Sequence, residues 1–413
     1  MAIGDIKMLE LKIGGMDLTD PNQASFKEID IVEDFTCKYG PAGQIIGVDQ
    51  TDSRVRNNIN GAYDQDVVIR FCDDSGRIVG FNLKQFEGAN LTDHAMNKEG
   101  SGKNAQFSLR CVSPELLNAQ GNYVEKSWED KTSKIAEDVL KEGFKTKLKI
   151  VAEETKEIKR VIASREHPSK FLDKLNETHV SAKNKSSCFF TYQRQKSGTS
   201  EYRIETVEEM CKQAPVADLI YSTTLDSSAS SEKDKINSII WINVDSNFHS
   251  GPRHLTKPSQ DTFNLYNHKA CSSAHKPAKY TLLGKEIYTG QAPNANNVPQ
   301  RSIYSKVNEP AQPITTAEAT QNRAEFLSKL AQNCAECEIV GNPDITLGSI
   351  INLKIPKRVD GASGFGAGES QFADKCLVVS IRHRIREHGQ SPRYTMVLRL
   401  VKASWSKSSG GTA

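Results

Sequence analysis

Residues 340–356, VGNPDITLGSIINLKIP, have a pattern typical of β structure. Residues 341–343 (GNP) are turn formers, and Leu-Gly at 347–348 predicts a second turn. The apolar run at 349–355 predicts a strand, and Pro356 ends its pairing because proline lacks an N–H donor. The stretch therefore predicts two strands joined by turns, with an architectural role.

The flanking residues extend this β pattern through the C-terminal part. Four strand candidates follow one another at 337–341, 349–356, 375–386 and 394–404. A helix is predicted before them in 315–334, where Thr315 and Glu318 match a capping box. The C-terminal part is thus predicted to be a β-domain entered from a helix.

The N-terminal part, residues 3–112, also has apolar residues at period two, which is typical of half-buried strands. Its clearest unit is a hairpin at 67–86, with turn formers at 73–76. A further strand is predicted at 105–113. The string LRCV at 109–112 returns as LRLV at 398–401, a hint of internal duplication.

Between these parts the periodicity becomes helical. A helix is predicted in 127–144, with Ser127 and Asp130 as a capping arrangement and Gly143 as its stop. A second helix follows Pro168, and two strands are predicted to pair around a turn at 196–199.

The rest of the middle part is less regular. Residues 222–235 are rich in Ser and charge and predict an exposed loop, whereas INSIIWINV at 236–244 predicts a strand. Residues 286–313 show no lasting periodicity and are interpreted as an extended arm lying along a neighbour.

Composition limits the class of protein. The 413 residues predict two or three domains, and 54 basic against 51 acidic side chains leave a net charge of +3, too small to drive binding to nucleic acid or anionic lipid. No run reaches the length of a membrane-spanning helix, and acidic residues interrupt the first fifteen positions where a signal peptide is apolar. Nine thinly spread cysteines favour a reducing, cytoplasm-like compartment.

Two motifs invite a chemical interpretation. Cys334 and Cys337 form a lone CxxC, either half a zinc site or redox pair, or two unrelated cysteines. The only other cluster, His268, Cys271 and His275, has irregular spacing, so unrelated cysteines are favoured. The glycine run at 361–370 lacks the Lys-Ser/Thr of a phosphate loop and favours a flexible hairpin connection.

Catalytic spacings are absent from the sequence. No HExxH and no GxSxG occurs, Asp73-Asp74 is explained by turn chemistry, and Glu153-Glu154 lies in a charged run. No catalytic, cofactor-binding or metal-binding residue is predicted, no cofactor is expected, and a non-enzymatic protein is favoured.

One charged row has two interpretations. Arg382, Arg384 and Arg386 share one face of a strand in IRHRIREHG, opposite Ile381 and His383. A solvated face is favoured over a patch for an acidic partner or passing nucleic acid. His383, on the inward face, is predicted to be a satisfied core histidine rather than a ligand.

Taken in order, these segments resemble the baseplate central hub proteins of contractile-tailed bacteriophages and, more distantly, the hub part of type VI secretion spikes. Two passages carry the resemblance most clearly, at 234–269 and 340–356. The matching positions are Leu255, Thr256, Asp261, Phe263 and Tyr266, then Gly341, Asn342, Pro343, Leu347, Gly348, Ile350, Ile351 and Pro356. The final hairpin, with its apolar run into Ile381-x-His383, resembles the end of these proteins as well.

The resemblance implies a mainly β fold with an α+β part: two tail-tube-like antiparallel β-barrel domains, a small α+β domain and extended arms. The implied divisions are 1–112, first barrel; 113–215, α+β domain; 216–329, linker, strand and arms partly contributing to the second barrel; 330–405, second barrel; and 406–413, flexible tail.

It also implies a function: a homotrimer with pseudo-sixfold symmetry that joins a hexameric tail tube to a three-fold spike and leaves a channel for DNA. The implied partners are the tail tube protein, a separate central spike protein, the tape-measure protein and baseplate wedge proteins, and the implied location is the tail baseplate of a virion assembled in the host cytoplasm. DNA passes without being specifically bound, and no membrane segment is implied. Two alternatives remain: the hub part of a type VI secretion or other contractile injection machine, and, less favoured, a peptidoglycan hydrolase.

Overall fold

The structure is a computed structural model of the chain. It describes residues 4–19, 24–35, 39–49, 65–87, 90–92, 105–184, 186–196, 198–221, 235–242, 258–264, 269–274, 281–283, 285–286, 300–306, 323, 327, 334–358, 365–369, 374–388 and 391–403.

Most of the described elements are strands. The N-terminal part contains β1 (Lys7–Ile13), β2 (Met16–Asp17), β3 (Ala24–Asp34), β4 (Ala42–Asp49), β5 (Asp66–Cys72), β6 (Ile78–Gln85), β7 (Asn90–Thr92) and β8 (Ala105–Val112). The C-terminal part contains β14 (Ala217–Ile220), β15 (Ile236–Ile242), β21 (Cys334–Val340), β22 (Ile350–Lys354), β23 (Pro356–Arg358), β24 (Phe365–Glu369), β25 (Asp374–Arg386) and β26 (Arg393–Val401). The predicted fold class, mainly β with an α+β part, is confirmed.

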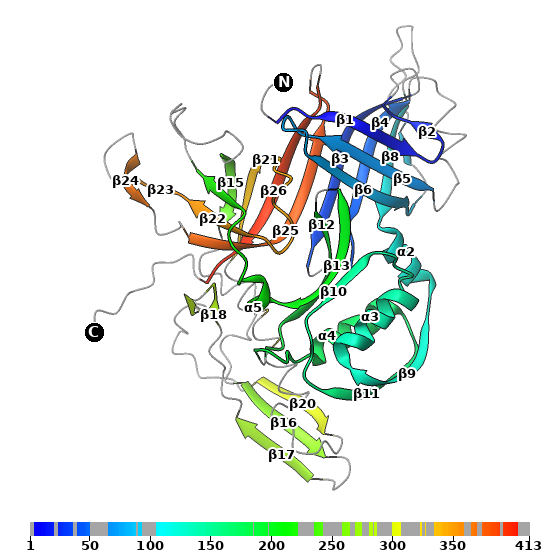
Figure 1. The fold of residues 1–413 in the computed structure, drawn as a ribbon, viewed down its shortest axis with the longest axis vertical. Helices are drawn as coiled ribbons and strands as arrows, with labels where there is room; N and C mark the ends of the chain where they lie inside the picture. Colours follow the sequence, from blue (N-terminus) through cyan, green and yellow to red (C-terminus); the bar gives the residue numbers. More distant parts are fainter. Residues whose placement is uncertain are drawn as a thin grey trace.

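The N-terminal and C-terminal strands form one hydrogen-bonded network. Its 14 strands contain the path β15-β21-β26-β25-β3-β4-β8-β6-β5-β1-β2, in which β25 and β3 pair antiparallel. Figure 1 shows the blue N-terminal strands beside the orange and red C-terminal ones. The strand β25 is long enough to pair with β22 through residues 374–377 and with β3 through residues 380–386. It therefore joins the two β parts.

The opening stretch has the turns and the central strand that its sequence predicts, but Pro356 does not end the pairing: it begins β23 and pairs with Glu369. β21 ends at Val340, the N–H of Ile345 donates to the carbonyl of Asn342 at 3.1 Å, and β22 ends at Lys354 before Pro356. Gly348 has a positive φ of 81°, the conformation that glycine adopts without a steric penalty. Gly341 has a different role, because a Cβ there would lie 1.9 Å from Cδ1 of Tyr394.

The two β parts repeat each other in chain order. β3, β4, β5, β6 with β7, and β8 correspond to β15, β21, β22, β25 and β26. The strings at 109–112 and 398–401 lie on β8 and β26. These are the middle strands of the two matching orders, β3-β4-β8-β6-β5 and β15-β21-β26-β25-β22. Val112 pairs with Ala42 on β4 as Val401 pairs with Cys334 on β21.

The pairing registers agree on both sides of this match. Arg110 faces Gln44 as Arg399 faces Glu336. A register shift lies at the same place in both outer strands, between Phe26 and Glu28 on β3 and between Ile236 and Ser238 on β15, and β15 has a second shift after Ile239. On the other side, Lys84 and Asn90 face Val112 and Ser108 on β8, and Leu377 and Arg382 face Val401 and Val397 on β26. Agreement of order, partner and register supports the duplication that the two strings only suggested.

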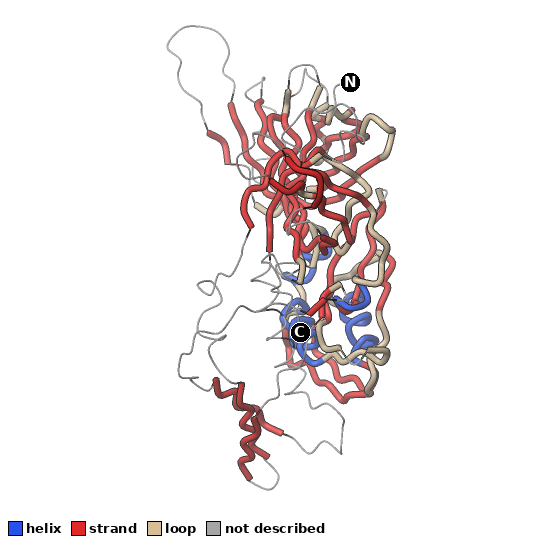
Figure 2. The backbone as a smooth tube through the Cα atoms, turned by 90° about the vertical axis from the view of Figure 1, so that its left-hand side faces the viewer, coloured by secondary structure: helices blue, strands red, loops and turns tan. Residues whose placement is uncertain are grey.

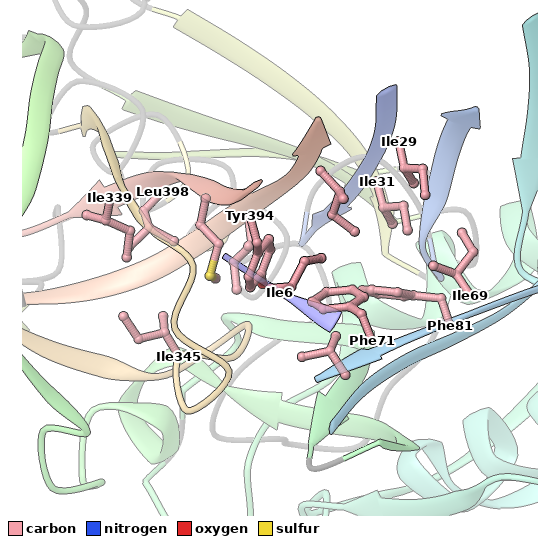
Figure 3. Close-up of a cluster of buried hydrophobic side chains, with 14 of the residues drawn as sticks. Ile6, Ile29, Ile31, Ile69, Phe71, Phe81, Ile339, Ile345, Tyr394 and Leu398 are labelled. Carbon is pink, nitrogen blue, oxygen red and sulfur yellow. The ribbon is translucent and has the colours of Figure 1, made fainter. Parts of the chain in front are cut away.

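A single apolar core fills the space between the two β parts. Ile29 and Ile31 from β3 meet Ile381 from β25 and Tyr394 from β26, and all four are buried. Figure 3 shows Tyr394 pointing toward Phe71 and Ile6 within this cluster. Burial of side chains from both ends of the chain gives the two β parts a common core.

The middle part adds helices on small sheets. Its elements are α2 (Pro114–Gly121), β9 (Val124–Lys131), α3 (Thr132–Glu142), β10 (Lys149–Ala152), β11 (Ile158–Glu166), α4 (Pro168–Thr178), β12 (Phe189–Lys196), β13 (Thr199–Thr206) and α5 (Val207–Met210). The predicted start at Pro168, the stop at Gly143 and the β12–β13 hairpin are confirmed. Figure 2 shows these helices below the main sheet.

The predicted start of the helix at 127–144 is wrong. Ser127 and Asp130 lie in β9, which pairs antiparallel with β11, and α3 begins only at Thr132 with no side-chain cap. Val124 and Trp128 are the buried apolar residues of β9, four positions apart, so the strand has a helix-like spacing.

The arm predicted at 286–313 is also corrected in part. Residues 300–306 form β20 (Gln300–Lys306), parallel to β16 (Pro258–Asn264), which also pairs with β17 (Lys269–Ala274). A two-stranded sheet unites β18 (Thr281–Leu282) and β19 (Lys285–Glu286). In the helix predicted at 315–334, Arg323 and Leu327 are helical, but the predicted end is wrong because Cys334 begins β21. The loop at 222–234, the tail at 406–413 and the rest of the arm lie outside the described residues.

Candidate functional site

The two cysteines of the CxxC motif do not form a shared site. Cys334 and Cys337 lie on β21 three residues apart, so their side chains point to opposite faces of the sheet. Cys337 lies in the core common to both β parts, whereas Cys334 packs in a second cluster with Leu377. Burial raises the pKa of Cys337 to about 12, which keeps the thiol protonated.

The other motif residues do not assemble a metal site in the described part of the chain. His268 and His275 lie outside it, and no group of three or more His, Cys, Asp or Glu residues is found among the residues it covers. Within the glycine run, residues 365–369 form β24, which pairs antiparallel with β23. That part of the run is a hairpin strand, and its other residues are not described.

The arginine row lies on the outward face of the sheet, defined as the side of β21, β26, β25, β3, β4 and β8 turned away from the common core. Arg382 forms a bidentate ion pair with Asp30 on β3 through Nε and Nη2, and Arg386 Nη2 lies 3.0 Å from Glu28 Oε1. Two members of the row are thus paired within the chain, while the Arg382 and Arg386 side chains stay 45% and 57% exposed to solvent.

Other arginines of the outward face have acidic neighbours too. Arg399 lies 4.0 Å from Glu336 on β21, and Arg110 lies 3.4 Å from Glu87. Carboxylates close to each of these guanidinium groups reduce the positive potential over the face. Sequence spacing could not show this, because the partners of Arg382 and Arg386 are about 350 positions away.

His383 is a core residue, as its inward position predicted. Its side chain is buried, its Nδ1 lies 2.7 Å from the Tyr394 hydroxyl, and its ring meets the Phe81 ring edge-on at 5.1 Å. Its Nε2 lies 3.8 Å from a carboxylate oxygen of Glu33, which is also buried. This polar group is part of the junction between β3, β25 and β26.

A cleft that the sequence did not predict lies at one end of the outward face. It has a volume of about 990 Å³ and separates β3, β4 and β8 from α2 and α4. The Tyr39 hydroxyl donates to Asp173 here, and burial together with that carboxylate raises the pKa of Tyr39 far above its usual value. Arg323 donates to the Phe189 carbonyl and lies over the Phe190 ring at 5.0 Å.

Two carboxylates of the cleft already have partners within the chain. Asp30 is paired with Arg382, and Asp173 accepts from Tyr39. Such engaged carboxylates suit a packing or recognition surface better than general acid and base chemistry.

In the described part of the chain no helix is long and apolar enough to cross a membrane.

No protein-family model matches the chain, and no curated protein matches it. Among solved structures, the 43 kDa tail protein of prophage MuSo2 from Shewanella oneidensis has 12% identity, covers 96% of this chain and 98% of its own, and gives a TM-score of 0.52. The tail protein from Neisseria meningitidis MC58 has 11% identity, with 97% of each chain covered and a TM-score of 0.56. A type VI secretion component from E. coli has 10% identity, 96% and 77% coverage, and a TM-score of 0.49.

The two tail proteins are matched over nearly their whole length, so the likeness includes the β parts and the middle part together. The chain therefore has the fold of these phage tail proteins, which is the baseplate-hub-like fold that its sequence indicated.

Proposed function

We propose that the chain is a structural, non-enzymatic hub of a contractile phage tail, placed in the virion baseplate. The observation that carries this is the internal repeat, in which five strand positions recur with equal order, partners and register. Three copies of a chain with two such repeats present six near-equivalent units around an axis that is truly three-fold. Such a ring fits a hexameric tube on one side and a trimeric spike on the other.

The repeat also supports the division into a first β unit at 1–112, an α+β unit at 113–215 and a second β unit centred on 330–405. β14 and β15, which lie before residue 330, pair with β22 and β21 and so extend the second unit into the preceding segment. We include these boundaries in the proposal.

The outward face of the sheet is proposed to line the channel of the ring. Support comes from the acidic neighbours of Arg382, Arg386, Arg399 and Arg110. Non-specific affinity for DNA grows with each phosphate that a free cation neutralises. Arginines held by carboxylates would let DNA pass without retaining it.

Light scattering and electron microscopy test the proposal. The purified chain, alone or with its spike protein, is expected to have three times the mass of the 45.7 kDa monomer and to appear as a ring with six lobes. A stable monomer in both settings would refute the hub assignment. Microscopy of whole particles would separate a DNA-filled phage tail from a protein-loaded injection machine.

A further inference from the structure

The joint between the two β parts of one chain is a strand pair. His383 on β25 faces Ile31 on β3, and Arg384 faces Asp30. The Arg382–Asp30 and Arg386–Glu28 ion pairs bridge the two strands on the outward face. The joint thus combines backbone pairing with charge pairs.

Two strands, β15 at the end of the path and β7, which pairs with β8 beside the path, hold the places that β3 and β25 hold in the internal joint. β15 occupies the place in its repeat that β3 occupies in the other, and β7 occupies the place of the β3-pairing half of β25. Within the described residues, β15 pairs along its length with β21 alone and β7 with β8 alone. An edge strand presents unpaired backbone groups to another chain.

We propose that β7 of one protomer pairs antiparallel with β15 of a second copy of the chain, and that this pair is the contact between protomers in the ring. The inference rests on the proposed trimer, because six near-equivalent units need six near-equivalent joints and each chain supplies one internally. A heterologous contact of this kind closes into a ring when its rotation divides a full turn. Strand addition at an edge is a common mode of protein recognition.

The internal joint fixes the register of the proposed one. Leu91 faces Phe107 on β8 as His383 faces Met396 on β26, so Leu91 holds the place of His383. Ile242 faces Ala335 on β21 as Ile31 faces Gly43 on β4, so Ile242 holds the place of Ile31. Leu91 should therefore face Ile242 of the second copy. By the same correspondence Thr92 should face Trp241.

The chemistry of the two joints differs. The places of Arg382 and Arg384 are taken by Asn90 and Thr92, and the place of Asp30 by Trp241. Ile240, which the register shift of β15 leaves outside the ladder, is 49% exposed. The contact between protomers thus has uncharged residues where the internal joint has ion pairs, and salt should not dissociate it.

Engineered disulfides test the register. The full-length double variant Leu91→Cys/Ile242→Cys, oxidised with diamide, is expected to run as a covalent trimer on a non-reducing gel, because facing residues bring their Cβ atoms within disulfide reach. Thr92→Cys/Trp241→Cys is a second facing pair, kept in case the first fails to fold. Leu91→Cys/Trp241→Cys is the matched control one residue out of register, and it should crosslink at least ten-fold less because a one-residue slip turns a side chain to the other face.

The outcomes separate the two proposals. If the unoxidised variants are trimeric by light scattering and neither facing pair crosslinks above the wild type, the β7–β15 contact is refuted and the hub assignment stands. Equal crosslinking of the facing and out-of-register pairs also refutes it. If the wild-type chain is a stable monomer with and without its spike, the hub assignment fails and this inference fails with it.

Discussion

Replacing Gly341 with alanine tests why the opening stretch needs glycine at that position. The φ of Gly341 is not among the positive values, so a left-handed turn is not the reason. Its added Cβ would lie 1.9 Å from Cδ1, 2.2 Å from Cε1 and 2.4 Å from Cγ of Tyr394. The ring must retreat by about 1.5 Å before ordinary contact is restored.

The surroundings of the ring set the cost. Tyr394 is 1% exposed, its ring packs edge-on against Phe71 at 4.9 Å between centroids, and its hydroxyl is hydrogen-bonded to His383. Overpacking a dense core costs about 1–3 kcal/mol, and loss of the hydrogen bond adds about 1 kcal/mol. We expect Gly341→Ala to lower the free energy of unfolding by roughly 2–4 kcal/mol.

A double-mutant cycle in urea denaturation, followed by circular dichroism, measures this. Tyr394→Ala alone should cost about 3–5 kcal/mol, and adding Gly341→Ala should cost little more because the clashing ring is gone. Gly15→Ala is the control, since nothing lies within 4 Å of its Cβ position. If Gly341→Ala is as stable as the control, or if the two costs simply add, the steric reasoning is wrong.

Three further outcomes are expected. Asp30→Asn should free Arg382 and raise the affinity for duplex DNA, steepening its dependence on salt by about one phosphate in fluorescence anisotropy; unchanged binding would contradict the proposed channel face. Glu153→Gln should cost about 1–3 kcal/mol in urea denaturation, because the Glu153 carboxylate accepts from both N–H and hydroxyl of Thr206 at 2.8 Å; a neutral effect would show that this network is dispensable. Cys337, whose pKa burial raises to about 12, should stay unlabelled by a thiol reagent at pH 8 until the chain is unfolded, and rapid labelling of the native chain would contradict its place in the core.

The sequence predicted local structure best where the signal was local. Turn formers and period-two alternation gave the 67–86 hairpin, and Pro168 marked the start of α4. The start of α3 was mispredicted because Val124 and Trp128 are spaced as in a helix, and only pairing with β11 makes that segment a strand. Strand β20 was overlooked for a similar reason, since its partner β16 lies about forty positions away.

The candidate site depended on contacts that spacing does not encode. The arginine row and its inward histidine could be placed on two faces of a strand, but the pairing of Arg382 with Asp30 required β25 to meet β3. The cleft beside Tyr39 had no sequence signal, because its walls come from separate strands and helices.

From the sequence alone follow the turns and the central strand of residues 340–356, and two short strings suggested that the chain repeats itself. The agreement of the repeats in pairing register, and their joint through β25 and β3, became visible only once the strands were paired in the fold. The tertiary structure also separated the two glycines of the stretch: Gly348 serves a left-handed turn, as local sequence indicates, whereas Gly341 makes room for a ring 53 positions away. Local propensity is a property of neighbouring residues, but steric space and register are set by whichever distant strand packs alongside.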